Sequence, residues 1–241
     1  MRAGVALRAL GPIDLTSVRR DPLLRWMGLL PLLVALLVRW GVPLVGRAGF
    51  PLEAYSDLLG SFLLMMTPMT YGTVIGFLLL DEKDERTLTA LQVTPLTPGA
   101  YLRYRIGIPC LLSVAITVIA LELSGLEVPG LGSELTAALA AAPLAPLYAL
   151  ILAAFARNKV QGFALMKASA ALNWPPLIAY FVGPEWQWLF GLCPTYWPAK
   201  LYWELASSSG GGEAWLFLIG VSFTGAISWW LLRRFDQAVH R

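Results

Sequence analysis

Long runs of apolar residues divide the chain into segments long enough to cross a bilayer. A helix needs about 20 mostly apolar residues to cross a hydrocarbon core of roughly 30 Å. Six runs approach this length, and the second and fourth are the most uniformly apolar. The runs cover Leu23–Val45, Leu58–Leu80, Ile106–Leu123, Leu135–Phe155, Ala168–Val182 and Ala214–Leu232. The pattern predicts an all-α membrane protein with six transmembrane helices in a single transmembrane domain over residues 1–241.

Three further segments are neither spans nor simple loops. Residues 1–22 mix leucines with arginines and predict a helix along the membrane interface, beginning near Asp14 or Thr16 because Pro12 interrupts the pattern. A disordered basic leader is the alternative. Residues 183–213 are rich in tryptophan, tyrosine and proline, which predicts short interfacial or re-entrant helices before the last span.

The loop over residues 81–105 carries the most informative polar pattern. Four acids crowd its beginning, where they suit a helix N-terminus, and two prolines end the helical pattern. Leu88 and Leu91 share one face. The segment predicts a short amphipathic helix that docks against a partner, and a solvated charged loop is the alternative. Its candidate residues are Glu82, Glu85, Arg86, Thr87, Leu88, Leu91, Thr94 and Pro95.

The few charged residues fix the orientation. Fifteen of the eighteen lysines and arginines lie in alternate connections, and such residues favour the cytoplasmic side. Both termini are therefore expected in the cytoplasm, together with the loop over 81–105. The basic residues of these connections are Arg2, Arg8, Arg19, Arg20, Arg25, Lys83, Arg86, Arg103, Arg105, Arg157, Lys159, Lys167, Arg233, Arg234 and Arg241.

Composition excludes several classes of protein. Hydrophobic residues make up 57% of the chain and charged residues 14%, against about 25% charged in soluble proteins. A net charge of +3 without a basic stripe argues against a nucleic-acid partner. Two cysteines and one histidine leave no metal-ligand cluster.

Polar residues inside the spans each have two interpretations. Arg39 and Glu122 lie near the outer ends of their spans, where they either form an intramembrane ion pair or reach the interface independently. Gly72 and Gly76 form a G-x-x-x-G pattern that allows close helix packing, either within the chain or between two chains.

The middle of the second span is flexible and slightly polar. Thioethers accommodate varied apolar ligands, so this stretch is a candidate lining of a substrate pathway. Ordinary core packing is the alternative. The candidate residues are Met65, Met66, Met69 and Thr70.

Several motifs together resemble the type 2 ABC transporter permeases, with the drug-export permeases associated with fluoroquinolones as the nearest subgroup. The similarity covers essentially the whole chain. The residues that carry it are Arg20–Leu24, Asp81–Leu88 with Leu91, Thr94–Leu96 and Tyr101, Ala156–Gly162 with Lys167, and Pro194–Trp197.

The resemblance implies an exporter subunit in a prokaryotic plasma membrane that moves a hydrophobic or amphipathic substrate. It implies a second permease subunit, identical or paralogous, and two ABC ATPase subunits that dock on the coupling helix in the loop over 81–105. The phosphate-binding G-x-x-x-x-G-K-[ST] motif is absent from the sequence, so ATP and Mg²⁺ are expected on the partner and no cofactor in this chain. The alternatives are an ATP-independent carrier or channel and an intramembrane lipid-modifying enzyme.

Overall fold

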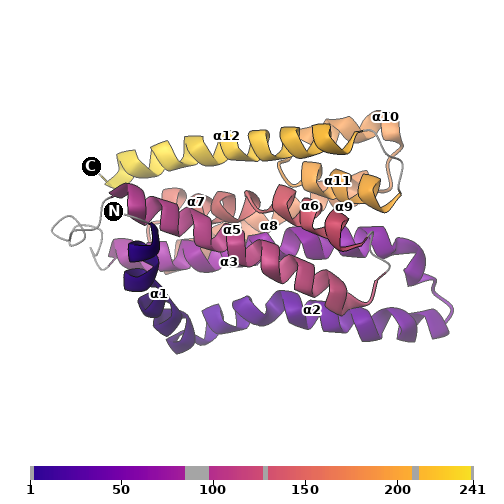
Figure 1. The fold of residues 1–241 in the computed structure, drawn as a ribbon, viewed down its shortest axis with the longest axis horizontal. Helices are drawn as coiled ribbons and strands as arrows, with labels where there is room; N and C mark the ends of the chain where they lie inside the picture. Colours follow the sequence, from indigo (N-terminus) through magenta and orange to yellow (C-terminus); the bar gives the residue numbers. More distant parts are fainter. Residues whose placement is uncertain (1–2, 85–97, 127–129, 208–211, 240–241) are drawn as a thin grey trace.

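The computed structural model describes residues 3–84, 98–126, 130–207 and 212–239, and these form a bundle of helices (Figure 1). The longer helices are α1 (Ala3–Arg20), α2 (Pro22–Arg47), α3 (Ser56–Asp84), α5 (Pro98–Ser124), α6 (Leu131–Ala141), α7 (Leu144–Phe155), α8 (Lys159–Ala170), α11 (Tyr196–Ala206) and α12 (Glu213–Val239). Shorter turns are η1 (Leu52–Tyr55), η2 (Ala171–Asn173), α9 (Trp174–Ala179), α10 (Pro184–Gln187) and η3 (Trp188–Leu192).

Within these described ranges, five helical segments are long and apolar enough to cross a membrane. They match the first, second, third, fourth and sixth predicted spans to within a few residues at each end. The fourth consists of α6 and α7, with a bend where Pro143 lies between them. The segments cover Pro22–Arg47, Leu52–Glu82, Tyr104–Ser124, Leu131–Phe155 and Glu213–Arg234.

The predicted fifth span is not one long helix. Its residues belong to α8, η2 and α9, and helical backbone begins at Lys159 rather than at Ala168. Two consecutive prolines, Pro175 and Pro176, occupy the first positions of α9 and cannot donate the backbone hydrogen bonds that would continue α8. The freed carbonyl of Leu172 accepts hydrogen bonds from side chains of the segment before α11.

This broken segment nevertheless runs along the whole length of α3. Near its start, the rings of Phe163 and Phe77 have centroids 4.9 Å apart. At its centre, Asn173 Nδ2 donates to the sulfur of Met69 at 3.1 Å. After α9, the rings of Phe181 and Tyr55 are 6.1 Å apart. The segment that follows α7 therefore passes from one end of the bundle to the other.

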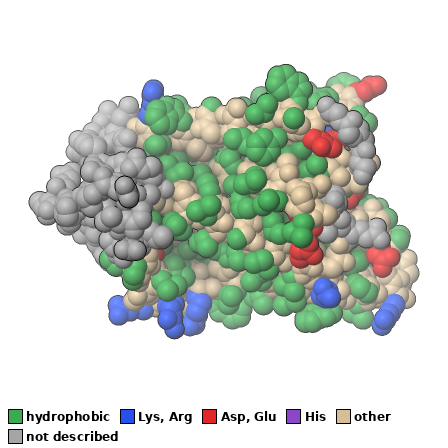
Figure 2. Space-filling model, in the orientation of Figure 1, with side chains coloured by type: hydrophobic (Ala, Val, Ile, Leu, Met, Phe, Trp, Pro, Cys, Tyr) green, Lys and Arg blue, Asp and Glu red, His purple; other side chains and the backbone are tan. Residues whose placement is uncertain are grey.

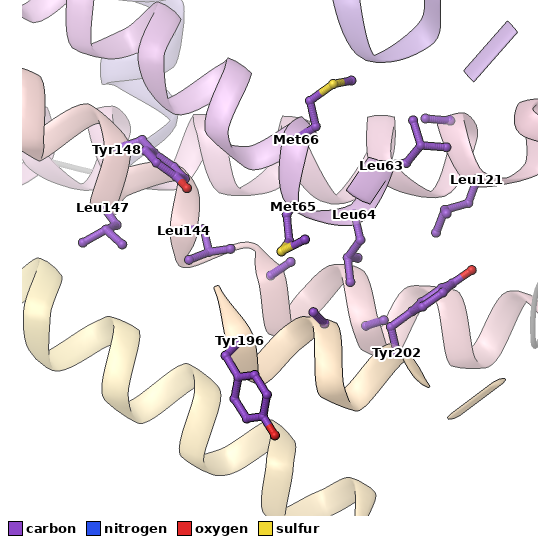
Figure 3. Packing of buried hydrophobic residues seen from close by; sticks show 14 of the residues in the cluster. Leu63, Leu64, Met65, Met66, Leu121, Leu144, Leu147, Tyr148, Tyr196 and Tyr202 are labelled. Carbon is purple, nitrogen blue, oxygen red and sulfur yellow. The ribbon is translucent and has the colours of Figure 1, made fainter. Parts of the chain in front are cut away.

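Helix α3 is the centre of the bundle. Its most apolar stretch is 89% buried, whereas the corresponding stretches of α2, α5 and α12 are 17%, 28% and 28% buried. The core around it includes Leu64, Met65 and Leu144 and the tyrosines of α7 and α11 (Figure 3). Most of the apolar surface of α2, α5 and α12 consequently faces outward. Figure 2 shows hydrophobic side chains across the middle of one face and charged ones mainly toward its two ends.

The G-x-x-x-G pattern packs α3 against α7 inside the chain. A Cβ atom on Gly72 would lie 2.2 Å from the carbonyl oxygen of Ala145, and one on Gly76 would lie 3.0 Å from Cβ of Leu152. The two backbones approach closely because neither glycine carries a side chain. The interpretation of these glycines as an internal packing seam is confirmed.

The N-terminal helix begins earlier than predicted. It runs from Ala3 through Pro12 to Arg20, whereas the sequence pattern placed its start near Asp14 or Thr16. Proline removes one backbone donor from a helix, a loss that tertiary contacts of α1 with α2 and α5 offset. The helix lies across the end of the bundle that holds both termini, which is called the terminal end below (Figure 1). Its far counterpart is called the opposite end.

The aromatic segment after α9 forms α10, η3 and α11 at the opposite end. Helix α11 is largely buried against α3, α6 and α12, whereas Trp186, Trp188 and Leu192 are exposed. Short helices were predicted in this segment, and residues 184–206 do contain them.

Candidate functional site

The terminal end of the bundle holds a buried charged cluster centred on Arg105. This arginine lies in the second turn of α5, and its side chain is only 3% exposed. Its Nη1 atom donates to Oδ2 of Asp14 on α1 at 2.8 Å, and its Nη2 atom donates to Oε1 of Glu82 on α3. One guanidinium thus joins three helices through charge-assisted hydrogen bonds.

Two tyrosines complete the cluster. Tyr104 donates its hydroxyl to Oδ2 of Asp14 at 2.7 Å, and Tyr101 donates to Oε2 of Glu82. The guanidinium carbon of Arg105 lies 5.5 Å and 5.6 Å from the centres of the rings of Tyr101 and Tyr104. Burial and then the charge of Asp14 raise the pKa of Tyr101, so its hydroxyl stays protonated and available as a donor.

A second, more exposed cluster lies beside the first. Lys159 begins α8, and its ammonium is 3.0 Å from Oδ1 of Asp81 on α3 and 3.7 Å from Oδ2 of Asp21. Asp21 also caps α2, where its other carboxylate oxygen accepts from the backbone of Leu23 at 2.9 Å. The hydrogen bond from Lys159 to Asp81 raises the pKa of the lysine. The last turns of α3 are therefore bonded to α5 through Glu82 and to α8 through Asp81.

The two clusters surround the helix ends that border residues 85–97. Helix α3 ends at Asp84 and α5 begins at Pro98, so these residues connect two of the three helices that Arg105 joins. Of the predicted docking residues, Glu82 belongs to the buried cluster. The remaining seven lie outside the described residues: Glu85, Arg86, Thr87, Leu88, Leu91, Thr94 and Pro95.

The sequence interpretation missed the central residues of this cluster. Arg105 entered only the count of basic residues, and Asp14 only the start of a helix. Tyr101 and Arg105 are one helical turn apart, and Glu82 precedes them at the end of the previous span. A tyrosine and an arginine four residues apart, following a glutamate at the end of the previous span, could have indicated this cluster from the sequence.

Arg39 binds the end of α5 at the opposite end of the bundle. Its Nη1 atom donates to the carbonyl oxygen of Leu123 at 3.3 Å, and its side chain lies along Gly125, which has a φ of +66°. A cation at the C-terminus of a helix is favoured by the free carbonyls there. The predicted partner Glu122 is adjacent in sequence to Leu123 and exposed, and its ion pair with Arg39 stays a prediction.

The predicted pathway residues lie in the interior of the single chain. Met65, Met66 and Thr70 are buried, and Met69 is partly buried against the same core. Thr70 donates its hydroxyl to the backbone carbonyl of Met66 at 2.7 Å. These residues pack against neighbouring helices, and their role in a pathway stays a prediction.

An apolar pocket adjoins the Arg105 cluster on its other side. It is a small cavity of about 20 Å³ and lies between α3, α5, α7 and α12. Arg105 and Tyr101 form one wall, and Leu232 of α12 forms another. The first turns of α5 are thus bonded to α3 and α1 and also border this small cavity.

These features define a class of protein: a polytopic helical membrane protein with ionic clusters that hold its helix ends together. The chain belongs to the family of fluoroquinolones export permease proteins that resemble Rv2686c, because the family model matches residues 14–232. The resemblance to drug-export permeases is therefore confirmed, and the family description indicates a transport protein.

Two relatives from Mycobacterium tuberculosis have the same level of similarity. The fluoroquinolones export permease proteins MT2760, from strain CDC 1551 / Oshkosh, and Rv2686c, from strain ATCC 25618 / H37Rv, are each 35% identical to the chain over 239 aligned residues. The alignment covers 95% of this chain and 94% of each relative. No solved structure matches the chain significantly.

Proposed function

We propose that this chain is the membrane subunit of an ATP-driven exporter whose ATP-hydrolysing subunits are separate polypeptides. The observation that carries the proposal is the Arg105 cluster. Because it bonds α1, α3 and α5 to one another, a force applied to residues 85–97 acts on all three helices together. An ATPase that closes on this segment would move them as one unit and change access to the pathway, as alternating access requires.

The proposal includes six crossings of the membrane. The broken segment α8–η2–α9 supports the sixth, because it passes along the whole of α3 between Phe163 and Phe181. With six crossings, both termini lie on the same side. Arg19, Arg20, Arg157, Arg233 and Arg234 all lie near the terminal end, which favours the cytoplasm for that end. In this orientation α1 lies along the inner interface, and α10, η3 and α11 close the outer face.

A second permease subunit, identical or paralogous, completes the pathway. The outward-facing surfaces of α2, α5 and α12 are apolar, and bilayer lipid and the second subunit would share them. The relatives are named for fluoroquinolone export. These drugs combine an apolar ring system with charged groups, and an amphipathic substrate of this kind suits a pathway formed between largely apolar helices. The plasma membrane of a prokaryote is the expected location, and ATP with Mg²⁺ would bind the partner.

Disrupting the coupling segment is expected to separate transport from ATP hydrolysis. The variant Glu85→Lys with Leu88→Asp reverses one charge and places another on the apolar face of the docking helix that the sequence predicts. Loss of such a contact lowers the affinity between the chain and its ATPase partner on the order of tenfold or more. The measurement is co-purification of the full chain with ATPase subunits identified by mass spectrometry, together with substrate-stimulated ATP hydrolysis in vesicles.

Leu192→Asp is the matched control for this experiment, because Leu192 is 87% exposed and lies at the opposite end. It should leave assembly and hydrolysis unchanged. Unchanged assembly and hydrolysis in the double variant would contradict the coupling role of the segment. Substrate transport by the purified chain without any ATPase would instead establish the ATP-independent carrier.

A further inference from the structure

Glu134 has a carboxyl group that the fold buries completely. It lies in the first turn of α6 and is 0% exposed. Neither of its carboxylate oxygens has a hydrogen-bond partner within the parts of the chain that the structure describes. A charged carboxylate in such surroundings is strongly unfavourable unless something neutralises it. Ionisable residues within membrane helices are rare and usually functional.

No lysine or arginine of the described structure bonds to Glu134, and Arg39, the cation at this end of α5, donates to the carbonyl oxygen of Leu123 instead. Glu122 of α5 is close enough to act on Glu134 electrostatically, and its charge has the same sign. Helix α3 contributes Asp57, and α12 begins at Glu213. On α11, the ammonium of Lys200 is 2.8 Å from a carboxylate oxygen of Glu204, four residues further along that helix. Repulsion between the acids therefore adds to the cost of an ionised Glu134.

Tyr202 of α11 is the second unpartnered group in this region. It is 0% exposed, and its hydroxyl has no hydrogen-bond partner in the described ranges. Burial and then the charges of Asp57 and Glu134 raise the pKa of Tyr202, which places the phenol within their electrostatic reach. The hydroxyl lies against Gly60, where a Cβ atom would be only 2.2 Å from it. In Figure 3 it points away from Met65.

We propose that Glu134 is a proton-binding site near the opposite end of the bundle and that it holds a proton in this conformation. A proton is the ligand that fits, because both carboxylate oxygens are buried and neither has a polar partner in the described structure. Binding converts the carboxylate and one proton from water into a carboxylic acid, with one O–H bond formed and no other bond changed. The proposal goes beyond the exporter function, because a proton site operates with or without an ATPase.

Infrared spectroscopy of the purified full chain in lipid tests the site directly. At neutral pH the wild-type protein should have a C=O stretching band of a protonated carboxyl, and Glu134→Gln should remove it. Glu185→Gln, at an exposed position on α10, is the control that should leave the band intact. Glu122→Gln should also retain it. A band that persists unchanged in Glu134→Gln would overturn the proposal.

A conservative variant keeps the experiment decisive if the glutamine variant does not fold. Glu134→Asp retains a carboxyl at the same position, so the band should remain at a shifted frequency. The wild-type spectrum alone is also a test, because a protein without any protonated-carboxyl band at neutral pH has no bound proton at Glu134. Neither result depends on ATP, so both are independent of the proposed coupling to an ATPase.

Discussion

Replacing Gly72 with alanine is expected to destabilise the protein strongly. The new Cβ atom would lie 2.2 Å from the backbone oxygen of Ala145, and backbone cannot rotate away as a flexible side chain can. Helices α3 and α7 would have to separate, and overpacking of this kind costs about 1–3 kcal/mol, with backbone clashes toward the upper end. For a chain of this size that corresponds to a fall of roughly 2–12 °C in melting temperature.

Two other glycines provide a graded comparison. Gly76→Ala should be milder, because its Cβ atom would lie 3.0 Å from Cβ of Leu152 and 3.2 Å from the carbonyl oxygen of Ala149, a smaller overlap than the 2.2 Å approach at Gly72. Gly28→Ala on α2 meets nothing within 4 Å and should leave the melting temperature unchanged or slightly raised, since alanine favours helices. The order of stability is measured by thermal unfolding of the purified variants in detergent. Equal melting of Gly72→Ala and Gly28→Ala would contradict close packing of α3 on α7.

The long apolar helices were predictable because membrane helices obey a length and hydropathy rule that is local in sequence. Both ends of α2 and the start of α12 fell within a few residues of their predicted positions for this reason. Which surface each helix buries is set by neighbours far along the chain. Composition alone does not distinguish α3, which is mostly buried, from α2, which is mostly exposed.

Two departures from the predicted helices involve prolines, and tertiary contacts stabilise both. The break at η2 persists because the carbonyl of Leu172 receives hydrogen bonds from Cys193 at 3.1 Å and from Thr195. Helix α1 continues through Pro12, and Asp14 in its second half is held by Arg105. Sequence rules for proline treat each helix in isolation, whereas these partners lie on other elements.

The candidate site was predictable only in part. Glu82 was selected from the acidic pattern, and its partners were not, because Arg105 lies 23 residues away from it and 91 residues away from Asp14. Basic residues near membrane ends are expected at the interface, where they are solvated. Arg105 is buried instead, because α1 packs across the end of the bundle. Glu134 was overlooked for a similar reason, since it stands near the end of its span.

Replacing Arg105 with methionine is expected to have the largest effect of any single substitution at the terminal end. The change leaves the carboxylates of Asp14 and Glu82 side by side, with side chains only 14% and 17% exposed and without a cation. Breaking one side of a buried ion pair costs about 3–5 kcal/mol. Arg105→Lys should be intermediate, because an ammonium keeps the charge and lacks the planar fork that reaches both carboxylates.

Two further variants test whether the stability lost in Arg105→Met comes from the broken ion pairs rather than from the change in side-chain shape. Lys159→Met removes the two ion pairs with Asp81 and Asp21, and because this lysine is 46% exposed the cost should be below about 1 kcal/mol. The triple variant Arg105→Met with Asp14→Asn and Glu82→Gln removes all three charges, and it should recover much of the stability lost in Arg105→Met because no buried charge remains unpaired. Thermal unfolding of the purified chain measures each difference. A triple variant no more stable than Arg105→Met would show that unpaired carboxylates are not the cause.

The coupling role predicts, in addition, that the recovered triple variant still loses substrate-stimulated ATP hydrolysis, since α1, α3 and α5 are then folded but no longer joined by charged hydrogen bonds.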